Sequence, residues 1–339
     1  MTPGTKGART LPLQVERFHE VDLPSGVHLP GVEQAFTLLG TPRADGSNVV
    51  LAFHSLTGLP DPRSWWPGLV GEDRLLDTGD WALLSPALLG ACHGTRVVGL
   101  EGPLPPPPGL GIRDQAHLVG HLLDRLGLER VHLAVGGSLG GMVALEWAAS
   151  FPERAGTVLS VAAPARQPAH ALAFNHLQRE ALELGGPGAG LGLARKIAML
   201  TYRTAGELDT RFGRDRREDG LWQVASWLDH HGRKLEERFQ AASYRALIGA
   251  MDRHDVGAGR PGGIAGALRA FQGRLVGVGI PGDLLYPDEL VREWVEAAGA
   301  DYRRIDSIHG HDAFLLEEAQ MAAILADALG HPRAPGGGA

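Results

Sequence analysis

The sequence predicts an α/β fold with a mostly parallel sheet and an inserted helical lid. Short apolar stretches at residues 131–135, 157–161 and 275–278 are typical of buried strands, and helical patterns follow or separate them. Such an alternation indicates a parallel sheet with helices on both faces. Residues 164–270 interrupt the alternation, because they contain helical patterns and no convincing strand. We therefore expect about a hundred helical residues between two strands of the sheet.

The composition is that of a globular protein and excludes several functions. A length of 339 residues allows one or two domains, and 44% apolar with 21% charged residues is an ordinary globular balance. The net charge of −7, without a Lys/Arg cluster, argues against nucleic acid as a partner. The only cysteine, Cys92, excludes an internal disulfide framework and favours a reducing compartment.

The two ends of the chain contain no targeting signal. The N-terminus lacks the apolar segment of a signal peptide, and no apolar run approaches the roughly 20 residues of a membrane span. We expect a cytoplasmic protein with no membrane partner. Residues 1–10 and 331–339 are polar and rich in glycine or proline, which predicts flexible tails.

The remaining elements follow from apolar periodicity and turn residues. Residues 43–47 predict a hairpin-like turn between the first two strands, and Gly-rich joints such as residues 185–190 separate the lid helices. The catalytic domain would comprise residues 11–163 and 271–330, and the lid residues 164–270. The expected strands are 32–39 and 48–53, followed by the buried strands 81–84, 131–135, 157–161, 275–278 and 302–305. The expected helices are 115–126, 142–150, 288–298 and 319–329 in the domain and 169–184, 193–202 and 221–253 in the lid.

The sharpest local motif is Gly136-Gly-Ser138-Leu-Gly140, which contains Gly-x-Ser-x-Gly. An apolar strand leads into it and a helical pattern leads out, as expected for a nucleophile elbow. Small residues suit this turn because the serine backbone is strained and neighbouring strands are close. The alternative is a phosphate-binding turn, but the spacing is wrong for a P-loop and no lysine follows. We therefore predict that Ser138 is a nucleophile.

A serine nucleophile requires a base, and the base requires an orienting acid. In α/β-hydrolases the acid and then the histidine follow the serine along the chain. Asp283 follows the strand at 275–278, and both His309 and His311 follow the strand at 302–305. These loops leave the sheet at the same edge as Ser138, so the residues alone leave two candidate bases.

Two other interpretations of this part of the chain, a metal site and a different catalytic acid, are less consistent with the sequence. His309, His311 and Asp312 resemble half of a binuclear zinc site, but the further ligands that such a site needs are missing, so no metal is expected. Asp288 and Asp306 are weaker candidates for the acid, and helix capping explains Asp288.

The oxyanion of an acyl-transfer intermediate needs two backbone donors. One is expected from Leu139, directly after the nucleophile, and the other from the loop after an early strand. The segment His54-Ser-Leu-Thr-Gly58 is such a loop, and Leu56 is its candidate donor.

Taken together, the motifs resemble the homoserine O-acetyltransferase family, which has the α/β-hydrolase fold. The similar segments span residues 48 to 330 in the order of the family. They are His54-Ser-Leu-Thr-Gly58, Trp65-Trp-Pro-Gly-Leu-Val-Gly71, Gly136-Gly-Ser-Leu-Gly-Gly-Met-Val-Ala-Leu-Glu-Trp147, Asn175-His-Leu-Gln-Arg179, Leu193-Ala-Arg-Lys-Ile-Ala-Met-Leu-Thr-Tyr202 and Ile308-His-Gly-His-Asp-Ala-Phe-Leu315.

The resemblance implies a role for individual residues. Ser138 would be the nucleophile, Asp283 the acid and His311 the base, because the family histidine stands in Gly-His-Asp. Arg195, Tyr202 and Asp312 would hold the amino-acid acceptor; without the resemblance, Arg195 would be taken for a solvated surface arginine. Arg195 and Tyr202 are two helical turns apart and so share a face, and a guanidinium can bind a carboxylate through two hydrogen bonds.

The resemblance also implies the reaction and the partners. An acetyl group would pass from acetyl-CoA to Ser138 and then to the side-chain hydroxyl of L-homoserine, a ping-pong reaction of methionine biosynthesis. No cofactor would be bound permanently, acyl-CoA would be a co-substrate, and a homodimer is expected. Alternatives are succinyl-CoA as donor, L-serine as acceptor, or a carboxylic-ester hydrolase with the same triad.

Some segments depart from the family pattern. Residues 102–111 are rich in proline where a longer polar stretch is usual, Ala87 replaces an asparagine, and the acid loop is Pro281-Gly-Asp283 rather than Ser-Asp-Trp. The joint at 185–192 is short. These departures do not affect the triad residues. They leave the identities of the acyl donor and of the acceptor undecided.

Overall fold

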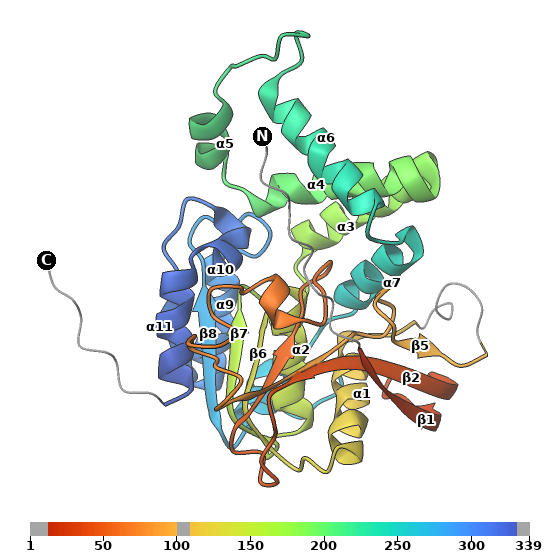
Figure 1. The fold of residues 1–339 in the computed structure, drawn as a ribbon, viewed down its shortest axis with the longest axis vertical. Coiled ribbons are helices and arrows are strands. Elements are labelled where there is room, and N and C mark those ends of the chain that lie inside the picture. Colours follow the sequence, from red (N-terminus) through yellow and green to blue (C-terminus); the bar gives the residue numbers. More distant parts are fainter. Residues whose placement is uncertain (1–12, 100–108, 331–339) are drawn as a thin grey trace, which may run out of the picture.

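A computed structural model describes residues 13–99 and 109–330 of the chain. Its centre is a nine-stranded sheet with helices on both sides, and a group of helices stands at one end of the molecule (Figure 1). The expected flexible tails and most of the Pro-rich segment lie outside the described residues.

The sheet changes from antiparallel to parallel across its width. The strand order is β1-β2-β4-β3-β6-β7-β8-β9, and the short β5 (Arg96–Val97) pairs with β2. The antiparallel part is formed by β1 and β2 together with the contacts of β2 to β4 and β5. All pairs from β4 to β9 are parallel. The strands are β1 (Gln14–Asp22), β2 (His28–Leu39), β3 (Val49–Phe53), β4 (Ala82–Pro86), β6 (Val131–Gly137), β7 (Ala155–Val161), β8 (Arg274–Gly279) and β9 (Asp301–Arg304).

Helices bury both faces of the parallel part, as the alternating pattern predicts. One core joins strand side chains to α1 (Ile112–Arg125), α2 (Leu139–Ser150) and α9 (Asp288–Ala298). The other core lies under α11 (Glu318–Ala328) and includes the buried side chain of Trp66. The central strands β3 and β6 are buried along almost their whole length, which fits continuous apolar runs between two helical layers.

Two predictions about the strands were wrong, and two strands were missed. Residues 43–47 form a turn, but the strands on either side are not neighbours, because β4 lies between β2 and β3. The expected buried strand at 302–305 is the edge strand β9, and its residues are exposed or half-buried. Strands β1 and β5 were not predicted. They lie at an exposed edge of the sheet, and their sequences mix polar and charged residues with apolar ones.

The segment between β7 and β8, residues 164–270, is called the insertion below. It contains α3 (Ala169–Gly185), a π-helical turn (Gly186–Gly190), α4 (Leu191–Tyr202), α5 (Ala205–Phe212), α6 (Gln223–Glu236), α7 (Ala241–Asp252) and α8 (Gly263–Arg269). The single helix expected at 221–253 is therefore two helices, α6 and α7. In Figure 1, α3, α4, α5 and α6 stand above the sheet, at the end where the site described below is found.

The Gly-rich joint allows α3 and α4 to fold back on each other. Gly186 has a positive φ of 66°, and a Cβ on Gly190 would lie 2.6 Å from the carbonyl oxygen of Ala181. Only glycine accommodates so close an approach of two backbones at these positions. The short joint is thus a tight turn, and the two helices pack along each other.

Candidate active site

Ser138 stands at the sharp turn between β6 and α2, as the Gly-x-Ser-x-Gly motif predicts. Its φ of 58° and ψ of −123° are unusual for a residue with a side chain. The Ser138 N–H donates to the carbonyl of Val161 at 2.9 Å, and its own carbonyl accepts from the N–H of Met142 at 3.0 Å. The neighbouring strand and the helix thus hold the strained turn from both sides.

The glycines around Ser138 leave no space for a side chain. A Cβ on Gly136 would lie 2.3 Å from the carbonyl of Gly140, and a Cβ on Gly140 would lie 2.2 Å from the carbonyl oxygen of Phe53. Real Cβ contacts are longer, so any larger residue would push α2 away from β3. The elbow motif is therefore a packing requirement as well as a chemical signal.

Three loops at the carboxyl ends of parallel strands bring a serine, a histidine and an aspartate together. His311 Nε2 lies 2.8 Å from Ser138 Oγ, and His311 Nδ1 lies 2.6 Å from Asp283 Oδ2. All three residues are at least 94% buried. Both geometry and chain order are those of a serine–histidine–acid triad.

The acid of this triad is itself held in place. Asp283 Oδ1 accepts hydrogen bonds from the backbone N–H groups of Leu285 at 2.8 Å and Tyr286 at 2.9 Å. The second carboxylate oxygen, Oδ2, is thereby left facing His311 Nδ1. An acid oriented in this way fixes the tautomer in which Nε2 accepts a proton.

The electrostatic surroundings favour the protonated form of His311. Burial alone would lower the pKa of this imidazole, but the charge and the hydrogen bond of Asp283, together with the charge of Asp312, raise the pKa above its usual value. The site thus stabilises a protonated imidazole at His311.

The loop that holds Leu56 is fixed by a neutral histidine. His54 is fully buried, and burial lowers its pKa to about 4. Its Nε2 accepts the N–H of Leu88 at 3.1 Å, so Nδ1 donates to the carbonyl of Ser55 at 2.8 Å. Leu56 lines the same pocket as Ser138.

The pocket in front of Ser138 contains the residues expected to bind the acceptor. Arg195, Tyr202 and Asp312 line this space of about 60 Å³ together with Ser138 and His311. The Arg195 guanidinium lies 5.3 Å from the centre of the Tyr202 ring, consistent with their shared helix face. Burial raises the pKa of Tyr202, so its hydroxyl keeps its proton at neutral pH.

An arginine that no sequence pattern had indicated binds Asp312. Arg203 Nη2 lies 3.0 Å from Asp312 Oδ2, and Arg203 Nη1 lies 3.0 Å from Glu207 Oε1. These side chains are at most 17% exposed. The spacing of Arg203 and Glu207, at i and i+4, was a signal for their pairing; nothing local indicated Asp312.

The alternative residues lie outside the triad. His309 Nδ1 contacts Glu207 at 3.2 Å rather than Ser138. Asp288 does not cap a helix as expected: it bonds Arg292 through Nε at 2.6 Å and also bonds Tyr302. In the described ranges no cluster of three or more His, Cys, Asp or Glu residues has the arrangement of a metal site. No helix among the described residues is long and apolar enough to cross a membrane.

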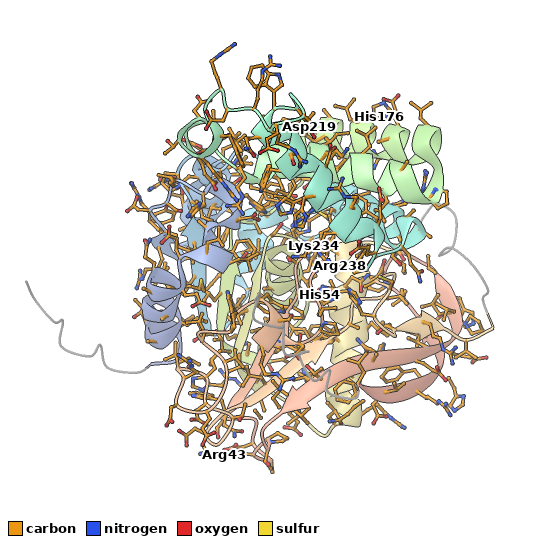
Figure 2. The ribbon with its side chains drawn as sticks, turned by 45° about the horizontal axis from the view of Figure 1, so that its top comes forward. Arg43, His54, His176, Asp219, Lys234 and Arg238 are labelled. Carbon is orange, nitrogen blue, oxygen red and sulfur yellow. The ribbon has the colours of Figure 1, made fainter. Side chains whose placement is uncertain are left out.

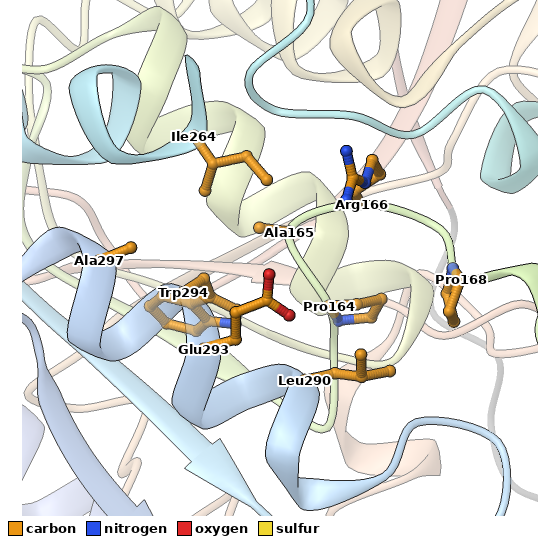
Figure 3. Close-up of a pocket in the computed structure, with 9 residues that line it drawn as sticks. All are labelled: Pro164, Ala165, Arg166, Pro168, Ile264, Leu290, Glu293, Trp294 and Ala297. Carbon is orange, nitrogen blue, oxygen red and sulfur yellow. The ribbon is translucent and has the colours of Figure 1, made fainter. Parts of the chain in front are cut away.

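A second cleft on the molecule contains none of the triad residues. A mostly apolar cleft of about 130 Å³ lies between the loop after β7, α8 and α9, and its lining includes Trp294, Arg166 and Glu293 (Figure 3). It shares no lining residue with the pocket around Ser138. The candidate active site is therefore the pocket of the triad.

Comparisons with known proteins agree with this fold and site. The family model described as alpha/beta hydrolase fold matches residues 48–227. The chain is 41% identical to a homoserine O-acetyltransferase of Thermus thermophilus, over 88% of this chain and 86% of that protein. A solved homoserine O-acetyltransferase from Staphylococcus aureus has 26% identity and a TM-score of 0.79, covering 96% of this chain and 97% of that one.

A further structural relative shows how widely this fold is used. Esterase E22 has a TM-score of 0.81 but only 17% identity, covering 94% of this chain and 99% of the esterase, so it shows the fold alone. Fold and triad together define an enzyme of the alpha/beta hydrolase fold. Within that class, the extensive identity to curated relatives shows that the chain belongs to the homoserine O-acetyltransferase family, which confirms the resemblance seen in the sequence.

Proposed function

We propose that this enzyme transfers an acetyl group from acetyl-CoA to the side-chain hydroxyl of L-homoserine through an acyl-serine intermediate, a step of methionine biosynthesis. The observation that carries the proposal is the contact of His311 with Ser138 on one side and Asp283 on the other, at 2.8 and 2.6 Å. The name of the curated relatives supports the acyl group and the acceptor.

In the first half-reaction, the acetyl group is transferred from acetyl-CoA to Ser138. His311 Nε2 takes the proton of Ser138 while the serine oxygen attacks the thioester carbonyl carbon. The backbone N–H groups of Leu56 and Leu139 donate to the oxyanion of the tetrahedral intermediate. The carbon–sulfur bond then breaks, the imidazolium of His311 returns the proton to sulfur, and CoA leaves the acetyl group on Ser138.

In the second half-reaction, the acetyl group passes from Ser138 to the acceptor hydroxyl by the corresponding steps. The acceptor hydroxyl gives its proton to His311 and attacks the acetyl carbon. When the new tetrahedral intermediate collapses, the ester leaves and His311 returns the proton to Ser138. One base therefore serves both halves, as expected for a ping-pong enzyme.

Arg195, Tyr202 and Asp312 fit the acceptor in charge as well as in position. The guanidinium of Arg195 pairs with the α-carboxylate, and the Tyr202 hydroxyl supports it as a neutral donor. Asp312 attracts the α-ammonium with the carboxylate oxygen that Arg203 leaves free. Arg203 is a positioning residue in this scheme, because it fixes Asp312 without contacting the acceptor.

Transfer competes with hydrolysis of the acyl-enzyme, so water has to be kept from Ser138. We assign this role to the insertion, which acts as a lid: α4 supplies Arg195 and Tyr202 to the pocket. The catalytic domain, residues 11–163 and 271–330, supplies the triad. A homodimer, which the family likeness suggests, remains part of the proposal.

The decisive experiment incubates the enzyme with acetyl-CoA or succinyl-CoA and with L-homoserine or L-serine. Release of free thiol and the product mass identify the donor and the acceptor. Mass spectrometry with acetyl-CoA alone should show one acetyl group on Ser138. Release of CoA without acyl-enzyme would contradict the ping-pong reaction, and equal hydrolysis with and without acceptor would indicate an ester hydrolase.

A further inference from the structure

One face of α6 carries basic side chains toward the catalytic end of the molecule. Trp227, His231, Lys234 and Arg238 follow one another at intervals of four, three and four residues, the spacing of a single helix face. Arg238 lies just beyond α6, but its N–H still bonds to the carbonyl of Leu235 at 3.1 Å, so the helical turn continues to it. Lys234 is therefore one turn before Arg238 on the same face.

Direct contacts connect this face with the catalytic pocket. Arg238 Nη1 donates to the carbonyl of Thr57 at 2.8 Å, and Nη2 lies 3.4 Å from the Thr57 hydroxyl oxygen. Thr57 lines the pocket with Ser138. In Figure 2, Lys234, Arg238 and His54 follow one another from the insertion toward the sheet, and His54 stands three residues before Thr57 in the chain.

Three positive charges on or beside this face lack acidic partners. Throughout residues 13–99 and 109–330, no carboxylate lies within 4.0 Å of the charged groups of Arg195, Lys234 or Arg238. On the same insertion, Lys196 and Arg203 each have a carboxylate partner at 3.0 Å or less. Unpaired cations are unexpected beside a buried site in a protein with a net charge of −7.

The pKa values of neighbouring groups reflect the positive charges on and beside this face. Burial and the charge of Arg195 lower the pKa of Arg238. The pKa of His231 is lowered to about 4 by burial and then by Arg195, His230, Arg203 and Lys234. Every charge that acts on His231 comes from a basic side chain, so an anion placed along this face would be attracted by Arg195 and Lys234, which have no carboxylate partner among the described residues.

We propose that Lys234 and Arg238 bind the phosphate groups of the acyl-CoA donor. The inference rests on the proposed function, in which Arg195 is occupied by the carboxylate of the acceptor. With the thioester at Ser138, the nucleotide end of the donor would run outward along α6. The contact with Thr57 leaves further guanidinium N–H groups of Arg238 free, and a guanidinium or an ammonium is the usual protein partner of phosphate.

The test compares two donors that differ in their phosphates. Acetyl-CoA carries them, whereas S-acetyl-N-acetylcysteamine has the same thioester without them. For Lys234→Gln and Arg238→Gln, the ratio of kcat/KM for acetyl-CoA to kcat/KM for the short thioester should fall about tenfold. Arg238 also holds the Thr57 loop, so its loss slows both donors, and the ratio isolates the contribution of the phosphates. The inhibition constant of free CoA should rise by a similar factor.

Arg233→Gln is the matched control. It removes one positive charge from the same helix but from a different face, so the donor ratio should stay at the wild-type value. An unchanged ratio and unchanged CoA inhibition in both Lys234→Gln and Arg238→Gln would overturn the inference while the proposed function stood. A shift in the preference for succinyl-CoA over acetyl-CoA, with CoA inhibition unchanged, would also overturn it and assign Arg238 to an acyl carboxylate. A wild-type enzyme that used neither CoA thioester and was not inhibited by CoA would refute both proposals.

Discussion

The turn around Ser138 and the insertion contribute to the same pocket by opposite means. At the turn, backbones touch: Gly136 and Gly140 have no room for a Cβ, and the strained Ser138 is held by backbone hydrogen bonds. In the insertion, long side chains extend from a helix (Arg195) or from residues just beyond a helix (Arg203 and Arg238) and end in charged groups.

This difference separates what is rigid from what is adjustable. The position of the nucleophile depends on close packing of sheet and helix, where a single added methyl group has to move a backbone. The proposed substrate contacts depend on side chains that can be exchanged without disturbing a strand. We therefore expect substitutions at the turn to damage folding or chemistry, and substitutions in the insertion to change substrate binding.

The largest effect is expected at the triad. Ser138→Ala and His311→Ala should each lower the rate of acyl transfer by roughly 10⁴-fold or more, because nucleophile and base act as one unit. Turnover with acetyl-CoA and L-homoserine measures this loss. Circular dichroism and thermal unfolding should remain close to wild type, and near-normal turnover in either variant would make the triad assignment wrong.

A pair of glycine substitutions tests the difference in packing directly. Gly140→Ala places a methyl group 2.2 Å from the carbonyl oxygen of Phe53 and should destabilise the protein by about 3 kcal/mol or prevent folding. Gly188→Ala in the joint of the insertion meets no atom within 4 Å, so its effect should be within about 0.5 kcal/mol. Urea unfolding of both variants measures the difference. Equal destabilisation would remove the distinction between the two regions.

The next effect concerns the acceptor alone. Arg195→Ala should raise KM for L-homoserine about 10- to 100-fold, because a charge-assisted pair with the carboxylate is lost. Arg195→Lys should recover part of the loss, since lysine keeps the charge but not the planar fork. Steady-state kinetics with both substrates varied provide the measurement. If only KM for acetyl-CoA changed, Arg195 would belong to the donor.

The smallest effect is a shift in pH dependence. His311 has to be neutral to accept a proton, so the rate of acyl-enzyme formation should rise with pH through its pKa, which lies above the usual 6.5. Asp312→Asn removes a charge that raises this pKa, so the rise should move to lower pH. Stopped-flow measurement with acetyl-CoA alone avoids acceptor binding, and the exposed Asp306→Asn is the control. An unmoved profile in Asp312→Asn would show that Asp312 does not influence the base.

The sequence was most informative where the constraint is local. The elbow combines a strand, a turn and a helix within a dozen residues, and its glycines mark the close approach of backbones. The strand–loop pattern placed Asp283 and His311 at the same edge as Ser138, and the choice of His311 over His309 came from the family resemblance. The structure brings Ser138, Asp283 and His311 within hydrogen-bonding distance.

Contacts between distant segments were not accessible in this way. Arg203 meets Asp312, and Arg238 meets Thr57, because the insertion folds back over the sheet. Neither contact leaves a periodic pattern in the sequence. The same limitation accounts for the wrong hairpin: a short turn at residues 43–47 is compatible with paired strands, but β4 enters between them from further along the chain.

The position of the insertion also determines when the site can assemble during synthesis. Val158 of β7 pairs with Leu275 of β8 across more than a hundred intervening positions, and closing so long a loop has an entropic cost before the pairing stabilises it. Asp283 and His311 both follow β8. A nascent chain therefore contains the serine turn and the whole insertion before it contains either Asp283 or His311, so the three side chains can meet only after the entire insertion has been synthesised.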